Sequence, residues 1–313
     1  MNHTILRYDS SLPIEVHSIL QAIIKSSIEI QRAIRFQTIH RLQDHKKVHQ
    51  NASGDFQEPL DVLSNTIMVM HLIQSKACNV LISEENECPI QVPTEQRGTH
   101  LVAFDPLDGS SNLSCNGPVG TIFSIYENKR EEIYLPSSHL RATGYILYGP
   151  ATELIIAAQG QVQRYVLDSF NKYEYVGTIQ IPKNGKAIYS INEASSAQWG
   201  VDIRRWIDGY KVAGTKYTAR YIGSMVADVH RTLLYGGVFC YPADKKNPNG
   251  KLRLFYECIP MAYIMELAGG KAIVGKASVQ RILELVPKEI HRRSPILLGS
   301  IQEIETYQMR SKL

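Results

Sequence analysis

Cysteine is scarce in this sequence, and nothing in its spacing pairs one cysteine with another. The 313 residues contain 5 cysteines, an odd number, widely spaced and without a C-x-x-C motif. This pattern argues against a disulfide framework. Most of the cysteines stand in or beside apolar runs, so we expect buried free thiols in a reducing compartment. They are Cys78, Cys88, Cys115, Cys240 and Cys258.

Long hydrophobic runs are also missing. No stretch approaches the roughly 18 apolar residues that a membrane-spanning helix needs. The N-terminal stretch MNHTILRYDSSLP has neither the basic region nor the apolar region of a secretory leader. We therefore expect a soluble, cytoplasmic protein that does not act at a membrane.

The sequence has little excess of charge of either sign. Its formal net charge is +4, with a pI near 8.7. The densest basic cluster holds only four cations, Lys245, Lys246, Lys251 and Arg253, and is interrupted by Asn, Pro and Gly. Such a cluster suits a small anion better than a polyanion, so we expect no nucleic-acid partner.

The patterns that are present predict a mixture of helices and strands. Hydrophobic residues make up 44% of the chain, enough for one large domain or two of ordinary size. Helical periodicity runs over 13–36 and 59–76, and short apolar strands follow up to about residue 167. A Pro/Gly/Lys break near 180–188 predicts a boundary between domains 1–182 and 183–313.

Beyond this break, the sequence predicts alternating strands and helices. A helix is expected to begin near Ser224 and to end at Gly236-Gly237. The run KLRLFYE (251–257) is predicted as a strand that meets a second helix with Pro260 in its first turn. The fold class is therefore α/β, or mixed α+β.

Acidic residues recur at the ends of the predicted strands. Glu84-Glu85, Asp105 with Asp108, and Glu257 each follow a short apolar run, and Asp61 lies in a predicted helix. Carboxylates brought together would repel one another and take up protons unless a cation held them. Oxygen ligands in this number suit Mg²⁺ or Mn²⁺, and the backbone carbonyl of Leu107 could add another.

The residues after these aspartates could bind phosphate. Gly109-Ser110-Ser111-Asn112 offers backbone N–H groups and two hydroxyls, and a helical turn beginning there would form a phosphate cradle. Cations on one side and amides on the other predict phosphoryl transfer or phosphate-ester hydrolysis. The plainer alternative is an acidic turn followed by a capped helix.

The stretches FDPLDGSSN, SEEN, GDFQEPLDVLSN, ARYIGSMVADVHRTLLYGG and YPADKKNPNGKLRLFYECIPMAYIMELAGG resemble class I fructose-1,6-bisphosphatases. The resemblance covers roughly 50–300, and its D-x-x-D-G-S core is shared with the lithium-sensitive, magnesium-dependent phosphatases. It implies a layered αβαβα fold of two tightly packed subdomains with mixed sheets. It also implies removal of the 1-phosphate from fructose 1,6-bisphosphate in gluconeogenesis, with two to three Mg²⁺ per subunit (Mn²⁺ or Zn²⁺ as alternatives).

The resemblance also implies roles for individual residues. Asp61 and Glu85 would form a proton-relaying dyad, and Asp55 would belong to a mobile loop that closes on the metals, its alternative being an ordinary loop aspartate. Asp108, Gly109, Ser110 and Ser111 would also contact the substrate. The metal ligands would be Glu84, Glu85, Asp105, Asp108, Glu257 and the carbonyl of Leu107.

The second phosphate of the substrate would have its own ligands, given by the same resemblance. They are Asn192, Tyr221, Tyr241 and Lys251, with Arg220 supplied by a neighbouring subunit. These residue types suit phosphate recognition, although the tyrosines on their own would be read as core or interface aromatics. The resemblance also implies a homotetramer built from dimers.

The chain departs from the family pattern at two places. Groups usual in the AMP-inhibition site are absent, among them a Lys-Tyr pair replaced here by Thr99-His100, which predicts weak or absent inhibition by AMP. Ser195 stands where the family usually has tyrosine. A sedoheptulose-1,7-bisphosphatase or a dual enzyme stays open as an alternative. An inactive sugar-phosphate sensor and an inositol-phosphate phosphatase are disfavoured.

Overall fold

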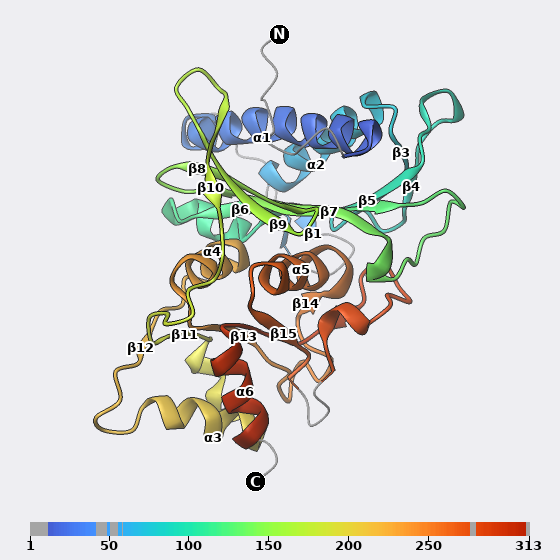
Figure 1. The fold of residues 1–313 in the computed structure, drawn as a ribbon. Helices are drawn as coiled ribbons and strands as arrows, with labels where there is room; N and C mark the ends of the chain where they lie inside the picture. The colour runs from blue at the N-terminus through green and yellow to red at the C-terminus, as the bar shows by residue number, and fades with distance from the viewer. Residues whose placement is uncertain (1–11, 42–48, 51–55, 58, 276–279, 311–313) are drawn as a thin grey trace.

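The computed structural model describes residues 12–41, 49–50, 56–57, 59–275 and 280–310, and its elements stack in five layers (Figure 1). Helices α1 and α2 cover one face of a large sheet, and α4 and α5 separate that sheet from a smaller one. Helices α3 and α6 cover the outer face of the small sheet. The predicted layered α/β class is confirmed. The helices are α1 (Ile14–Arg41), α2 (Pro59–Gln74), α3 (Val201–Tyr210), α4 (Met225–Tyr235), α5 (Ile259–Leu267) and α6 (Ile301–Arg310).

The large sheet has eight strands in the order β10-β9-β8-β7-β6-β5-β3-β4. Strands β3 and β5 are parallel, and all other neighbours in this sheet are antiparallel. The parallel pair brings the carboxyl ends of β3 and β5 to the same edge. The strands are β3 (Cys78–Ser83), β4 (Ile90–Gln91), β5 (His100–Asp108), β6 (Val119–Glu127), β7 (Leu140–Tyr148), β8 (Thr152–Ala158), β9 (Gln161–Leu167) and β10 (Tyr173–Thr178).

The smaller sheet has five strands in the order β12-β11-β13-β17-β15, with β12 at one edge. Separate two-stranded pairs are formed by β14 with β16 and by β1 with β2. No helix among the described residues is long and apolar enough to cross a membrane. The strands are β1 (His49–Gln50), β2 (Phe56–Gln57), β11 (Ile188–Ser190), β12 (Thr218–Ala219), β13 (Val238–Tyr241), β14 (Leu252–Arg253), β15 (Lys271–Ile273), β16 (Arg293–Ser294) and β17 (Ile296–Gly299).

Helices α4 and α5 share a core with the large sheet. Val229 and Ile264 belong to the same buried cluster as Ile122, Tyr145 and Ile155 of β6, β7 and β8. Helix α4 starts after Ser224, whose hydroxyl accepts the Ala227 N–H (3.4 Å), and its C-cap is Gly236 at φ +80°. The second half of the chain therefore completes the core of the first.

The first predicted helix is longer in the structure than the sequence indicated. It was expected over 13–36 and runs from Ile14 to Arg41, because no Gly or Pro interrupts the residues that follow the apolar stripe. Three cysteines (Cys78, Cys240 and Cys258) are buried and two are exposed, and all five are free. The expectation of mostly buried free thiols is confirmed.

The strand predicted over KLRLFYE is wrong. Only Leu252 and Arg253 form a strand, β14, and Leu254–Cys258 is a π-helical turn that leads into α5. The Arg253 N–H donates to the Glu257 carboxylate (2.5 Å) instead of to a neighbouring strand. Because residues 252–257 are all buried, their hydrophobic pattern could not distinguish a strand from a buried helical turn. Glu257 therefore lies at a helix entrance, not at a strand end.

Candidate active site

Strand β3 places two glutamates at the carboxyl edge of the large sheet. Glu84 follows its last residue and donates its N–H to the Phe104 carbonyl (3.2 Å), so the pairing with β5 continues past the strand end. The next N–H, of Glu85, donates to Ser83 Oγ (3.2 Å), which bends the chain into a turn. The pair of glutamates is thus fixed beside the end of β5.

Helix α2 holds this turn from one side. Asn65 Oδ1 accepts the Ser83 hydroxyl and its Nδ2 donates to Asn86 Oδ1, both at 2.8 Å. Asp61 lies one helical turn before Asn65, so both residues belong to the face of α2 that meets the glutamate turn. Asp61 is buried. The structure therefore brings the predicted helix aspartate to the predicted pair of glutamates.

A β-bulge turns the two aspartates of β5 to one side. Residues three apart in a regular strand point to opposite faces. The pairing of β5 with β6 shifts between Asp105 and Asp108, which adds one residue to β5. The two side chains therefore point to the same side of the sheet. The bulge is held by two hydrogen bonds, from the Leu107 N–H to Asp105 Oδ1 (2.9 Å) and from Thr121 Oγ1 to the Pro106 carbonyl (2.8 Å).

Three carboxylates meet where the bulge faces the helix entrance. Oxygen atoms of Asp105, Asp108 and Glu257 all lie within 4.8 Å of one another, and the three side chains are buried. Arg253 is buried beside them and donates from Nη2 to Glu84 Oε1 (2.6 Å). One guanidinium offsets only part of the negative charge, so this region remains suited to cations.

Burial raises the pKa of all three carboxyl groups. The pKa of Asp105 lies well above its ordinary value because of burial and the neighbouring Glu84, and that of Glu257 is raised to about 8, chiefly by burial. The pKa of Asp108 rises to about 6, since burial outweighs the N–H of Val226 and the hydroxyl of Ser224, both 2.9 Å from Oδ2. Buried oxygen ligands that resist ionisation without a counter-charge fit a hard divalent cation.

Gly109 connects the aspartates to a short helix. Its φ of +75° is left-handed, and a Cβ there would lie 2.9 Å from Ser224 Cβ, so a side chain is excluded on both grounds. A 3-10 helix, η2 (Ser110–Cys115), begins at once, which is the condition for a phosphate cradle at these residues. The first N–H groups of a helix have no partner within it and can bind an anion.

The predicted distal-phosphate residues fall into two groups. Asn192 and Tyr241 line one small cavity of about 30 Å³, together with Ser195. Burial raises the pKa of Tyr221, and Tyr241 is close enough to raise it further. Arg220 and Lys251 do not line this cavity, and they lie directly after edge strand β12 and directly before β14; both are exposed, as are Asn192 and Tyr221. Asp55 lies outside the described residues.

Comparisons with known proteins agree with this arrangement. Two family profiles match, "Fructose-1-6-bisphosphatase, N-terminal domain" over 7–177 and "Fructose-1-6-bisphosphatase, C-terminal domain" over 181–312. This chain belongs to the fructose-1,6-bisphosphatase family. The predicted family, fold class and enzyme class are thereby confirmed.

Relatives within the fructose-1,6-bisphosphatase family span most of the chain. Cytosolic fructose-1,6-bisphosphatases of Solanum tuberosum and Oryza sativa subsp. indica are 45% and 46% identical over 267 residues, which is 82% of this chain and 77% of each relative. The crystal structure of Leishmania major fructose-1,6-bisphosphatase in holo form matches with a TM-score of 0.90 and 38% identity. That match covers 96% of this chain and 95% of the Leishmania chain.

Several site residues of this fructose-1,6-bisphosphatase were missed by sequence reasoning. Arg253 was interpreted as part of a basic cluster that suits a small anion, although its place four residues before Glu257 fits a buried contact with that carboxylate. Asn65 follows Asp61 by one helical turn, a spacing that could have indicated its position. Ser224 was noted as a helix start, and no local signal linked it to Asp108.

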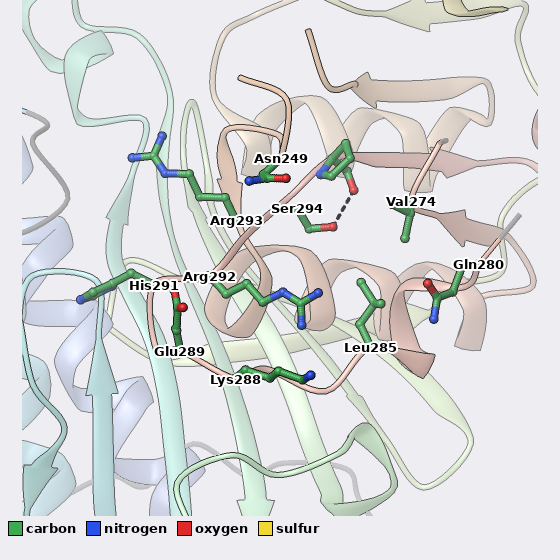
Figure 2. Close-up of a pocket in the computed structure, with 11 residues that line it drawn as sticks. Asn249, Val274, Gln280, Leu285, Lys288, Glu289, His291, Arg292, Arg293 and Ser294 are labelled. Carbon is green, nitrogen blue, oxygen red and sulfur yellow. Dashed lines mark hydrogen bonds between the residues drawn. The ribbon is translucent and has the colours of Figure 1, made fainter. Parts of the chain in front are cut away.

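A second cavity, of about 660 Å³, lies beside β16 (Figure 2), and its lining includes no residue of the acidic cluster. Its lining includes Lys288 and Arg292, whose side chains extend toward Leu285, whereas His291 points away from them. None of the residues predicted for the site lines this cavity.

Proposed function

We propose that this protein hydrolyses the 1-phosphate of fructose 1,6-bisphosphate, giving fructose 6-phosphate and inorganic phosphate, as a step of gluconeogenesis in the cytoplasm. The observation that carries the proposal is the buried cluster of Asp105, Asp108 and Glu257 directly beside the Gly109 turn. Curated relatives named cytosolic fructose-1,6-bisphosphatase support the substrate and the location.

Two to three divalent cations would bind at the acidic cluster, Mg²⁺ first and Mn²⁺ or Zn²⁺ as alternatives. When bound, they would supply Lewis-acid polarisation of the phosphoryl group and stabilise the leaving oxygen. Arg253 would share Glu84 with them, because its guanidinium contacts that carboxylate. The residues that would hold the cations are Glu84, Glu85, Asp105, Asp108, Glu257 and, through its carbonyl, Leu107.

The side chains around the cluster would orient the reactants and move the proton. Asp61 and Glu85 would accept the proton of the attacking water, since a carboxylate with acidic neighbours holds a proton more readily. The N–H groups of Gly109, Ser110 and Ser111 would bind the phosphoryl oxygens, and Asp108 would contact the sugar end of the scissile ester. The water oxygen bonds to phosphorus, the bond from phosphorus to the C1 oxygen breaks, and that oxygen takes up a proton.

Asp55 would complete the site from the preceding loop. This role rests on the family resemblance alone, because the residue lies outside the described part of the chain. Its replacement by asparagine would lower turnover if the loop closes over the reacting group.

The 6-phosphate would be bound at the small sheet. Asn192, Tyr221, Tyr241 and Lys251 offer an amide, two phenols and a cation. Arg220 would reach the site of a neighbouring subunit, because it is exposed next to edge strand β12 and therefore available to a second copy. This arrangement would need at least a dimer, and the family resemblance favours a homotetramer.

One observation favours a wider substrate range. Ser195 replaces the usual tyrosine of the family, and the cavity it lines, about 30 Å³, is roughly the space of one water molecule or one extra CHOH group. Sedoheptulose 1,7-bisphosphate is longer than the fructose ester by one such group. We therefore propose it as the second candidate substrate.

Phosphate release from the two bisphosphates, with and without Mg²⁺, tests these proposals. We expect Mg²⁺-dependent release from fructose 1,6-bisphosphate and weaker release from sedoheptulose 1,7-bisphosphate. An Asp105→Asn variant serves as the control for contaminating phosphatases. Activity that survives chelation of divalent cations, or that is absent with both esters, would overturn the proposed function.

A further inference from the structure

Asp228 joins the two segments that carry the proposed distal-phosphate residues. Its carboxylate, on α4, is fully buried. Oδ2 accepts the backbone N–H groups of Ile222 (3.0 Å) and Gly223 (3.1 Å). Oδ1 accepts the hydroxyl of Ser190 (2.8 Å), at the end of β11. One side chain therefore holds two loops that are about 30 residues apart in the sequence.

Both segments, the end of β11 and the loop before α4, lead directly to proposed ligands of the substrate. Arg220 and Tyr221 immediately precede Ile222, whose N–H is bound to Asp228. Asn192 follows Ser190 by two residues. Because backbone N–H groups are bonded, the carboxylate fixes the path of the chain itself and not only the direction of one side chain.

The chemistry of these contacts makes them stronger than ordinary loop contacts. Arg231 Nη2 donates to Asp228 Oδ1 (2.7 Å), which balances the buried charge. Hydrogen bonds to an ionised acceptor are stronger than those between neutral groups. Gly223, at φ +87°, adopts a conformation open to few residues, so this loop has little rigidity of its own. The hydrogen bonds to Asp228 supply the rigidity that the loop sequence lacks.

We propose that Asp228 is a positioning residue for the distal phosphate. It holds the backbone next to Arg220 and Tyr221 directly and the segment of Asn192 through the Ser190 hydroxyl, so that their side chains lie where the substrate needs them. This inference rests on the proposed function, because it assumes a substrate with a second phosphate. The chemical class it predicts is a sugar bisphosphate and not a monophosphate.

The test compares fructose 1,6-bisphosphate with fructose 1-phosphate, which lacks the distal phosphate, using full-length Asp228→Asn enzyme and saturating Mg²⁺. The asparagine keeps the shape of the side chain but replaces one acceptor oxygen by an NH₂ group. We expect KM for the bisphosphate to rise about tenfold or more, because the side chains that contact the charged distal phosphate are displaced. The kcat/KM for fructose 1-phosphate should stay within about twofold of wild type, because the reacting end is unchanged.

Asp168→Asn is the matched control. Asp168 Oδ1 likewise accepts two backbone N–H groups, of Phe170 and Lys172 (both 2.8 Å), but it lies in the turn between β9 and β10. This variant should leave KM for the bisphosphate and kcat/KM for fructose 1-phosphate unchanged. If Asp228→Asn does not fold, Ser190→Ala removes one donor only and should raise KM for the bisphosphate about threefold.

An equal fall of activity on both substrates would overturn the positioning role and indicate general disorder of the site. An unchanged KM for the bisphosphate in folded Asp228→Asn enzyme would overturn it as well. Failure of the proposed function gives a different result, in which wild-type enzyme itself releases no phosphate from the bisphosphate.

Discussion

Acidification should destabilise the protein through His230, a buried residue of α4. Its ring nitrogens face the Tyr145 hydroxyl (2.9 Å, Nδ1) and Glu153 Oε2 (3.5 Å, Nε2). The Glu153 carboxylate is already held by Arg164 through hydrogen bonds of 2.6 and 2.8 Å, so it stabilises a protonated ring only weakly. Burial is the stronger effect, and it lowers the pKa of His230 from 6.5 to about 4.

The sign and size of the effect follow from this shift. Because the pKa in the folded state lies below that in the unfolded chain, protons bind the unfolded chain more readily between pH 6.5 and about 4. The contribution to stability is complete above the unfolded pKa and is lost as the pH falls toward the folded one. The linkage between proton binding and unfolding lowers the free energy of unfolding by about 2 kcal/mol between pH 7 and pH 5 through this one residue.

Urea unfolding at both pH values, at one fixed protein concentration, would measure this loss. The fluorescence of Trp199 and Trp206, both buried, would report unfolding. The control is His230→Gln, which does not titrate and can keep a hydrogen bond to the Tyr145 hydroxyl. The free energy of unfolding of the wild type should fall by about 2 kcal/mol more than that of the variant between pH 7 and pH 5. Equal losses in the two proteins would refute the reasoning, because other groups would then account for the pH dependence.

Three further predictions concern the site. Glu85→Gln should lower kcat by about two orders of magnitude or more with little change in KM, and near-normal turnover would remove Glu85 from the proton relay. Arg220→Ala should weaken binding of the bisphosphate more than binding of Mg²⁺. Mixing it with Asp105→Asn should restore part of the activity through hybrid subunits, and no recovery would count against a shared site. Micromolar AMP should inhibit the enzyme weakly or not at all in steady-state assays, and strong inhibition that disappears on mutating the 10–30 segment would contradict this.

The cluster of carboxylates could be predicted because its members are marked locally. Glu84 and Asp105 follow apolar runs of strand length, and acidic residues that cluster in such places indicate a bound cation. The helix after Ser224 was equally visible, since a capping residue precedes its apolar stripe and Gly236 follows it. In each case the signal lies within a few residues of the feature that it predicts.

Other parts of the site depend on contacts between distant segments. The π-helical turn before α5 forms because Arg253 bonds Glu257 inside a core that surrounds the run on all sides, and an apolar run does not show from which sides it is covered. The contacts of Asp108 with Ser224 and of Asp228 with Ser190 join residues far apart in the chain. No periodicity or spacing in the sequence carries that information. The proposed domain boundary near residue 182 stays a prediction.

The core that α4 and α5 share with the large sheet has a consequence for synthesis of the protein. While a ribosome makes the first 180 residues, one face of that sheet has no helices to cover it, so the nascent chain exposes apolar side chains such as Ile122 and Ile155. Glu257 is added after most of the chain has been made. A protein shortened before Glu257 would thus lack both an acidic ligand and α5, which covers part of the sheet, and we expect it to aggregate instead of folding into an inactive but soluble form.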